Sequence, residues 1–187
     1  MMSNWRTMTN CTRYAVPRWA ALLSAALIAL AGVAAASAGS PGLIGQPAPD
    51  FALPAVVGSN VRLSEYRGQP VILSFWGSQC SSCIKQLAAL DRLYGTYRSA
   101  GLVVLGVSVD DNLSRAQQFA HARAPTFPML LDSPKNVSRS FVIDRLPTTV
   151  LIDRSGVVRY IHSDNGADER SYVVQIRTLL DDKPALP

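Results

Sequence analysis

The stretch Val71–Cys83, VILSFWGSQCSSC, joins an apolar run to two cysteines that are separated by two residues. Its first six residues are apolar apart from Ser74 and rich in β-branched and aromatic side chains, which is typical of a strand buried on both faces. Gly77 and Ser78 then suit a turn, and apolar residues follow at helical spacing: Ile84, Leu87, Leu90, Tyr94 and Tyr97. The stretch therefore predicts a central strand, a turn, and a helix that begins at Cys80.

A helix start at Cys80 has a chemical consequence. The unpaired N–H groups and the positive dipole end of a helix N-terminus stabilise an anion, and cysteines of C-x-x-C motifs at helix starts have lowered pKa values. Because the thiolate is the attacking species in disulfide exchange, we predict that Cys80 is the nucleophile. Cys83 lies about one turn further on, where its thiol can attack the mixed disulfide and release the substrate reduced.

The cysteine pair could also bind a metal or form a purely structural disulfide. A tetrahedral zinc site needs four ligands, and beyond Cys80 and Cys83 the chain offers only Cys11, His121 and His162 as cysteine or histidine ligands. A purely structural disulfide over two intervening residues closes a very short loop and gains little chain entropy. We therefore favour the hypothesis that Cys80 and Cys83 form a redox-active disulfide, and we expect no cofactor and no metal.

The N-terminal segment has the pattern of an export signal. Residues 1–18 contain three arginines and no acidic residue, residues 19–38 are uncharged, and the apolar run ends in Ala36-Ser37-Ala38. This pattern predicts a signal peptide within residues 1–38, cleaved after Ala38. An uncleaved run of about 20 residues would instead anchor the chain in the inner membrane. In both cases the remainder is predicted to be periplasmic or otherwise extracytoplasmic, with membrane contact only through this segment.

Charge and cysteine usage beyond the leader narrow the function further. The whole chain has net charge +5 and a pI of about 9.4, but the residues after Ala38 carry 15 basic and all 13 acidic residues, which leaves +2. There is no basic stripe that suggests a nucleic-acid partner. Cys11 lies in the leader, so the exported part keeps only the C-x-x-C pair, as expected of thiols used for exchange.

The order of the later segments predicts one α/β domain. We expect a linker at 39–49, the domain at 50–182 and a tail at 183–187. Besides the central strand, strands are expected at 51–53, 61–63, 102–109, 129–131, 149–153 and 157–162, and helices at 80–100, 114–123, 135–141 and 168–180. Asp110, Asp111 and Asn112 are interpreted as cap candidates for the helix at 114–123 rather than as a metal cluster.

Five motifs in this order carry a family resemblance: QPAPDFALP at 46–54, LSEYRGQPVILSFW at 63–76, C-S-S-C at 80–83, LVVLGVSVDD at 102–111 and LPTTVLID at 146–153. From about Gly45 to Leu180 the chain resembles the TlpA-like and ResA-like thiol-disulfide oxidoreductases of the thioredoxin-like (redoxin) superfamily. Those proteins work outside the bacterial cytoplasm and are often tethered to the membrane. The resemblance implies a thioredoxin-like fold, with a central mixed β-sheet, helices on both faces, an N-terminal β-hairpin and a strand–helix insert.

The resemblance also implies a substrate-binding surface beside the cysteines. Pro147 is expected to follow a cis peptide bond and to lie against the cysteine pair. The backbone of Leu146 would then be free to pair with an extended substrate strand. Trp76 is the third residue for which substrate contact is expected.

Several positions depart from the family pattern. Gln79 stands where tryptophan usually precedes the first cysteine, and Ser81 and Ser82 leave the motif without a proline. Ala88 replaces a helix-kinking proline, and Gln86 stands where an acidic residue is common. These changes leave the exchange chemistry intact and bear on the redox potential and on the choice of partner.

Two rival functions are kept as alternatives. A thiol peroxidase of the peroxiredoxin type activates its cysteine with a proline and a threonine seven and three residues upstream, positions that hold Leu73 and Gly77 relative to Cys80. A copper-delivery module would use the two thiols and a distal histidine such as His162. Its cysteines, however, are normally separated by three residues rather than two.

The sequence therefore predicts an exported, monomeric thiol-disulfide oxidoreductase that exchanges disulfides with protein substrates. Ser81 and Ser82 supply no cation, so the helix dipole and amide groups should leave Cys80 with an intermediate pKa, near thioredoxin's value of about 7. This favours a reductant that a membrane electron relay keeps reduced. Cytochrome c maturation and periplasmic redox homeostasis are the expected settings.

Overall fold

The computed structural model of this 187-residue chain describes residues 42–163 and 168–182. The predicted leader at 1–38, the tail at 183–187 and the first residues of the predicted linker lie outside the described residues. Within the described ranges, no helix combines the length and apolar character needed to span a membrane.

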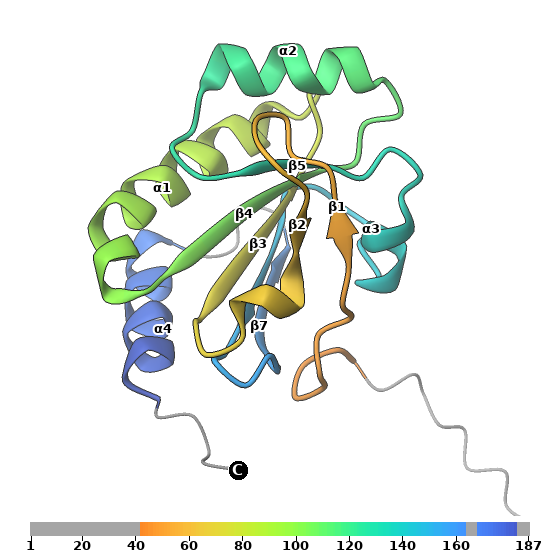
Figure 1. Ribbon diagram of the computed structural model, residues 1–187. Coiled ribbons are helices and arrows are strands. Elements are labelled where there is room, and N and C mark those ends of the chain that lie inside the picture. The colour runs from red at the N-terminus through yellow and green to blue at the C-terminus, as the bar shows by residue number, and fades with distance from the viewer. Residues whose placement is uncertain (1–41, 164–167, 183–187) are drawn as a thin grey trace, which may run out of the picture. The chain divides into compact units, whose positions relative to one another are not determined.

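A five-stranded mixed sheet forms the centre of the domain, in the strand order β5-β4-β3-β6-β7 (Figure 1). Its strands are β3 (Val71–Trp76), β4 (Val103–Ser108), β5 (Met129–Leu131), β6 (Thr148–Ile152) and β7 (Val158–Ser163). β4 runs parallel to β3 and β5, whereas β6 runs antiparallel to β3 and β7. The predicted central strand is confirmed, because β3 is the middle strand and all of its residues are buried.

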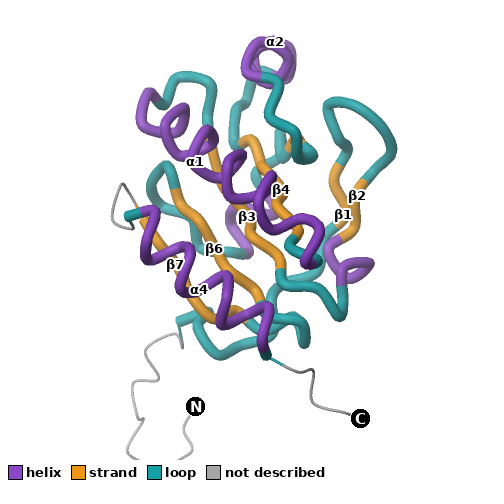
Figure 2. The backbone as a smooth tube through the Cα atoms, turned by 90° about the vertical axis from the view of Figure 1, so that its left-hand side faces the viewer, coloured by secondary structure: helices purple, strands orange, loops and turns teal. Residues whose placement is uncertain are grey.

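Helices cover both faces of this sheet, as predicted, and Figure 2 views it from the side of α1 and α4. The helices are α1 (Ser81–Tyr97), α2 (Leu113–Arg123), α3 (Asn136–Ser140) and α4 (Glu169–Asp181). Successive strand side chains point to opposite faces, so Ile72 and Trp76 pack with α1, α2 and α4, while Leu73 and Phe75 pack with α3. The hairpin of β1 (Ala52–Leu53) and β2 (Val61–Arg62), followed by the short 3-10 helix η1 (Leu63–Tyr66), joins α3 on the second face.

The segments before β1 and between β1 and β2 cover part of each outer edge of the sheet. Along β7, the N–H of Gly45 donates to the carbonyl of Val158 at 2.7 Å. Along β5, the N–H of Val56 donates to the carbonyl of Met129 at the same distance, 2.7 Å. Pairing at an edge removes free N–H and C=O groups that would otherwise invite another strand. Part of the segment predicted as a linker is therefore hydrogen-bonded to the sheet.

Val142 offers a test of backbone strain in the loop after α3. Its φ is 53°, a left-handed conformation in which a β-branched residue is strained, and its side chain is 75% exposed. Val142→Asn should therefore raise the free energy of unfolding by about 1 kcal/mol, since Asn tolerates this conformation. Urea denaturation measures the change. Val174→Asn, at a 64% exposed site within α4, is the matched control, and an equal gain there would contradict the strain explanation.

Candidate active site around Cys80 and Cys83

Cys80 caps the N-terminus of α1, which begins at Ser81. Its backbone is extended, and its Sγ accepts a hydrogen bond from the N–H of Cys83 at 3.1 Å. The hydroxyl of Ser82 lies 3.3 Å from the same sulfur. The predicted helix start is thus confirmed, and the Cys80 sulfur lies where the N–H groups and the dipole of a 17-residue helix favour negative charge.

The two cysteines are joined by a disulfide, with their Cα atoms 5.3 Å apart. They differ sharply in exposure. Cys83 is 0% exposed, whereas Cys80 retains some accessible surface. Of the two residues, only Cys80 can be approached from solvent in this state.

A cavity of about 360 Å³ lies beside Cys80. It is formed by the turn before α1, the segment that leads from β4 into α2, and the loop before β6. The lining residues are Gln79, Cys80, Val109, Asp110, Asp111, Asn112, Arg115 and Leu146. The cavity lies at the carboxyl ends of the parallel strands β3 and β4, the end of an α/β sheet at which ligands commonly bind.

Leu146, which precedes Pro147, lies against the turn before the cysteines. The peptide bond between them is cis, as the resemblance implied. Leu146 lines the cavity together with Cys80, and a Cβ placed on Gly77 would come within 3.2 Å of the Leu146 side chain. Glycine at position 77 therefore lets the loop before β6 approach the turn before α1.

Trp76 does not reach the cavity. Its side chain is 0% exposed, and its ring stacks on Phe119 of α2 with the centroids 4.7 Å apart. Trp76 is the last residue of β3 and points into the core shared with α1 and α2. This burial does not support the expected substrate contact, which stays a prediction.

Asp110 was predicted as a cap candidate for α2, but in the structure it lies at the active site. Asn112 caps α2, since its Oδ1 accepts a hydrogen bond from the N–H of Arg115 at 2.9 Å. The Asp110 carboxylate instead accepts hydrogen bonds from the N–H of Ser78 at 2.9 and 3.1 Å and from its hydroxyl at 2.9 Å. The hydroxyl of Ser108 adds a further bond at 3.0 Å. One signal in the sequence could have suggested the contact between Asp110 and Ser78. Asp110 follows β4 as Ser78 follows β3, and the ends of parallel neighbouring strands lie close together.

A polar network lies beneath α1. The amide of Gln86 donates to the hydroxyls of Thr149 and Tyr172, at 3.2 and 2.9 Å, and burial raises the pKa of the Tyr172 phenol above its ordinary value. His162, the candidate distal copper ligand, lies against the ring of Tyr172 with the centroids 5.1 Å apart. Its Nε2 lies 2.8 Å from the side-chain oxygen of Gln175. This histidine therefore belongs to the contacts between β7 and α4.

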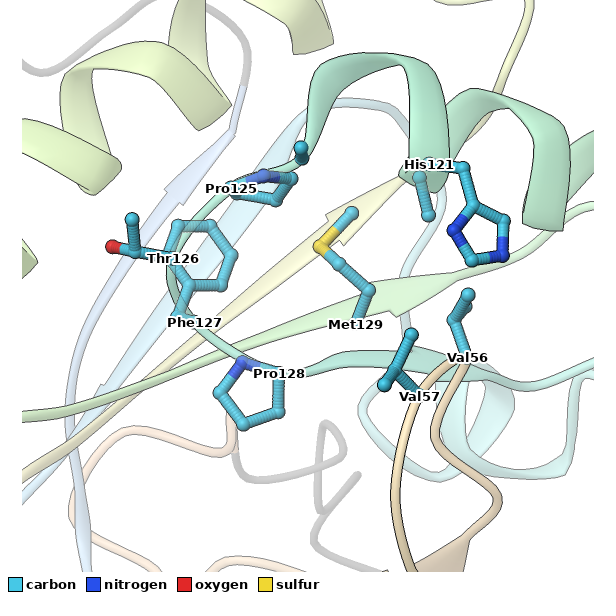
Figure 3. Close-up of a pocket in the computed structure, with 10 residues that line it drawn as sticks. Val56, Val57, His121, Pro125, Thr126, Phe127, Pro128 and Met129 are labelled. Carbon is cyan, nitrogen blue, oxygen red and sulfur yellow. The ribbon is translucent and has the colours of Figure 1, made fainter.

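His121, the other histidine weighed as a zinc ligand, lies at a second cavity of about 400 Å³ (Figure 3). This cavity lies between the C-terminal part of α2, the chain that follows it into β5, and the loop between β1 and β2. Figure 3 shows Met129 at its centre, between His121, Pro125 and Val57. It shares no lining residue with the cavity beside Cys80. The structure thus does not bring His121 and the cysteines to one cavity.

Comparisons with known proteins agree with this geometry. The model of the AhpC/TSA family matches residues 44–161. The thiol-disulfide oxidoreductase ResA of Geobacillus kaustophilus is 37% identical over 118 residues, which are 63% of this chain and 68% of that protein.

Two solved structures show the same fold. A Chlorobium tepidum protein assigned as the thiol:disulfide interchange protein DsbE superposes with a TM-score of 0.70 at 31% identity, over 73% of this chain and 97% of that one. A Bacteroides thetaiotaomicron protein assigned as a protein disulfide isomerase superposes with a TM-score of 0.68 at 28% identity, over 74% and 91% of the two chains. With its cysteine pair at the start of α1, the chain belongs to the AhpC/TSA family and, within it, to the ResA-related thiol-disulfide oxidoreductases with a thioredoxin-like fold.

Proposed function

We propose that this protein acts outside the cytoplasm as a reductant of protein disulfides, with Cys80 as the attacking thiol. The observation that supports this most directly is the asymmetry of the cysteine pair. Cys80 caps α1 and borders a cavity, whereas Cys83 is completely buried behind it. A protein substrate can therefore approach Cys80, and the second thiol is protected from competing reactions.

The reaction has two exchange steps. In the first, the Cys80 thiolate attacks one sulfur of a substrate disulfide, which forms a mixed disulfide and releases one substrate thiolate. In the second, the Cys83 thiolate attacks the Cys80 sulfur, which forms the Cys80–Cys83 disulfide and releases the second substrate thiolate. The substrate gains two electrons and two protons, and the protein is oxidised by the same amount. Another dithiol must then reduce the protein, and we assign that task to a membrane electron relay.

The cavity beside Cys80 supports a protein substrate. Leu146 lies at its wall, before the cis bond to Pro147, and its backbone is the surface along which an extended substrate segment would pair. The cavity is open and lined by both charged and apolar side chains, which suits a peptide better than a purely apolar ligand. The segments that cover part of each outer edge of the sheet support a monomer, because they leave fewer free backbone groups for another chain to pair with.

Export is part of the proposal because of the first 38 residues. They combine arginines, a long uncharged apolar run and the small residues at Ala36-Ser37-Ala38, as in secretory signals. Such a segment delivers the domain to a compartment in which disulfides form. Cytochrome c maturation and periplasmic redox homeostasis are the settings in which a reductant is needed there.

The peroxidase alternative finds little support in the structure. The position seven residues before Cys80 is Leu73, which is 0% exposed in the core with α3. The position three residues before it is Gly77, which carries no hydroxyl and packs against Leu146. Neither residue can activate Cys80 as the threonine of a peroxidase does.

The redox potential tests the direction of electron flow. We expect a value between roughly −270 and −200 mV, near those of thioredoxin and the glutaredoxins, because Ser81 and Ser82 add no cation that would stabilise the Cys80 thiolate. Equilibration of the purified domain with glutathione buffers measures it, and dithiothreitol-driven reduction of insulin measures turnover. A potential above about −150 mV would make the protein an oxidant and overturn the proposal.

A further inference from the structure

Asp110 is one of three charged residues that line the Cys80 cavity, with Asp111 and Arg115, and the exchange reaction gives it no role. Its carboxylate lines the cavity together with Cys80. Both of its oxygens accept hydrogen bonds from neutral donors, the N–H and hydroxyl of Ser78 and the hydroxyl of Ser108. Within the part of the chain that the structure describes, it forms no ion pair. Its negative charge is therefore held in place by neutral hydrogen-bond donors rather than by an ion pair.

These hydrogen bonds fix the turn that leads into Cys80. Ser78 is bound to Asp110 through both its backbone and its side chain. The N–H of Cys80 donates to the carbonyl of Gly77 at 3.0 Å, which closes the turn. The end of β4 thereby positions the start of α1, although the two residues that meet are separated by 32 positions in the sequence.

The same carboxylate affects the charge that Cys80 can carry. The N-terminus of α1 favours a thiolate, whereas the negative charge of a carboxylate that lines the same cavity disfavours one. Asp111 at the same cavity is 82% exposed and lies 2.8 Å from Lys135, so solvent and a cation compensate its charge. The other charged side chains on the segments that form the cavity are Lys85 of α1, Arg115 of α2, and the ion pair of Asp144 and Arg145 before Leu146.

We propose that Asp110 is a positioning residue that lowers the reduction potential of the cysteine pair, because its carboxylate both holds the turn before Cys80 and opposes negative charge on the Cys80 sulfur. The inference rests on the proposed exchange reaction. Destabilising the thiolate destabilises the reduced dithiol relative to the disulfide, and this lowers the reduction potential. Asp110 thus offsets part of the stabilisation that α1 gives to the Cys80 thiolate.

Asp110→Asn tests the effect of the charge. The amide oxygen can still accept a hydrogen bond from the N–H of Ser78, but the negative charge is gone. In glutathione buffers we expect the equilibrium to shift at least tenfold toward the reduced protein, which for two electrons corresponds to a potential about 30 mV higher. The pH profile of Cys80 alkylation by iodoacetamide should move to lower pH. Unchanged equilibrium and an unchanged profile would overturn the inference.

Two further variants separate the effect of the Asp110 charge on the potential from the effect of the turn that Asp110 holds. Ser78→Ala removes one hydrogen bond and keeps the charge, so it should lower the melting temperature and leave the equilibrium constant within about twofold of the wild-type value. Asp91→Asn is the matched control, since the Asp91 carboxylate also binds both the N–H and the hydroxyl of one residue, Thr126, at 2.7 and 2.8 Å. Asp91 lies eleven residues from Cys80 along α1, about 16 Å away, and its variant should keep the wild-type potential.

The outcomes also distinguish this inference from the proposed function. If Ser78→Ala shifted the equilibrium as far as Asp110→Asn does, the turn and not the charge would set the potential, and the inference would be wrong. Should Asp110→Asn not fold, Asp110→Ser provides a smaller neutral side chain for the same two measurements. Insulin reduction by the wild-type protein tests the proposed function alone, whereas the difference between the variants and the wild type tests the role of Asp110.

Discussion

Replacement of Cys83 by serine is expected to leave Cys80 joined to its substrate in a stable mixed disulfide. The reason is that the buried Cys83 thiol is the group placed to attack the Cys80 sulfur, one helical turn away, and serine cannot form a disulfide. A purified Cys83→Ser protein, incubated with a disulfide-bonded peptide, should carry one peptide per molecule. Intact-mass measurement before and after dithiothreitol detects this adduct.

Cys80→Ser is the control for that experiment and should give no adduct. Its remaining thiol, on Cys83, is 0% exposed in the folded protein and cannot reach the peptide. Insulin reduction should be lost in both single variants, because each removes one half of the exchange. Adducts on the Cys80→Ser variant and none on the Cys83→Ser variant would reverse the roles of the two thiols.

Trp76→Ala is expected to lower the free energy of unfolding by about 3 to 5 kcal/mol, the cost of removing a large aromatic side chain from a packed core. Trp76 is 0% exposed and lies between β3 and α2, stacked on Phe119. A loss of this size is a large part of the total stability of a typical domain, about 5 to 15 kcal/mol. Urea denaturation followed by circular dichroism measures it.

Val174→Ala serves as the comparison for Trp76, because this side chain is 64% exposed on α4 and its removal should change the stability by less than about 0.5 kcal/mol. A Trp76→Ala protein that keeps wild-type stability but no longer reduces insulin would show that the ring contacts the substrate. We expect instead that the free energy of unfolding falls.

Local patterns in the sequence were sufficient to predict most of the elements around the site. The apolar run Val71–Trp76 predicted the central strand, and the helical spacing after it predicted a helix start at Cys80, which is the N-cap residue of α1. Asn112 was among the predicted caps of α2, and β5 was predicted with its observed bounds, Met129–Leu131. These features depend on neighbouring residues, through hydrophobic periodicity, capping side chains and prolines that break the chain, so they can be read along one segment at a time.

The sequence by itself therefore determined the redox pair, the helix that presents it and the α/β class of the domain. Only the tertiary structure decided what surrounds the pair. β4 pairs with β3 in a register that places Ser108 opposite Trp76, and this brings Asp110 to Ser78 rather than to the start of α2. The same register and the packing of α2 turn Trp76 into the core. No local pattern encodes these contacts, because the choice among possible strand neighbours depends on how all the apolar faces are buried together.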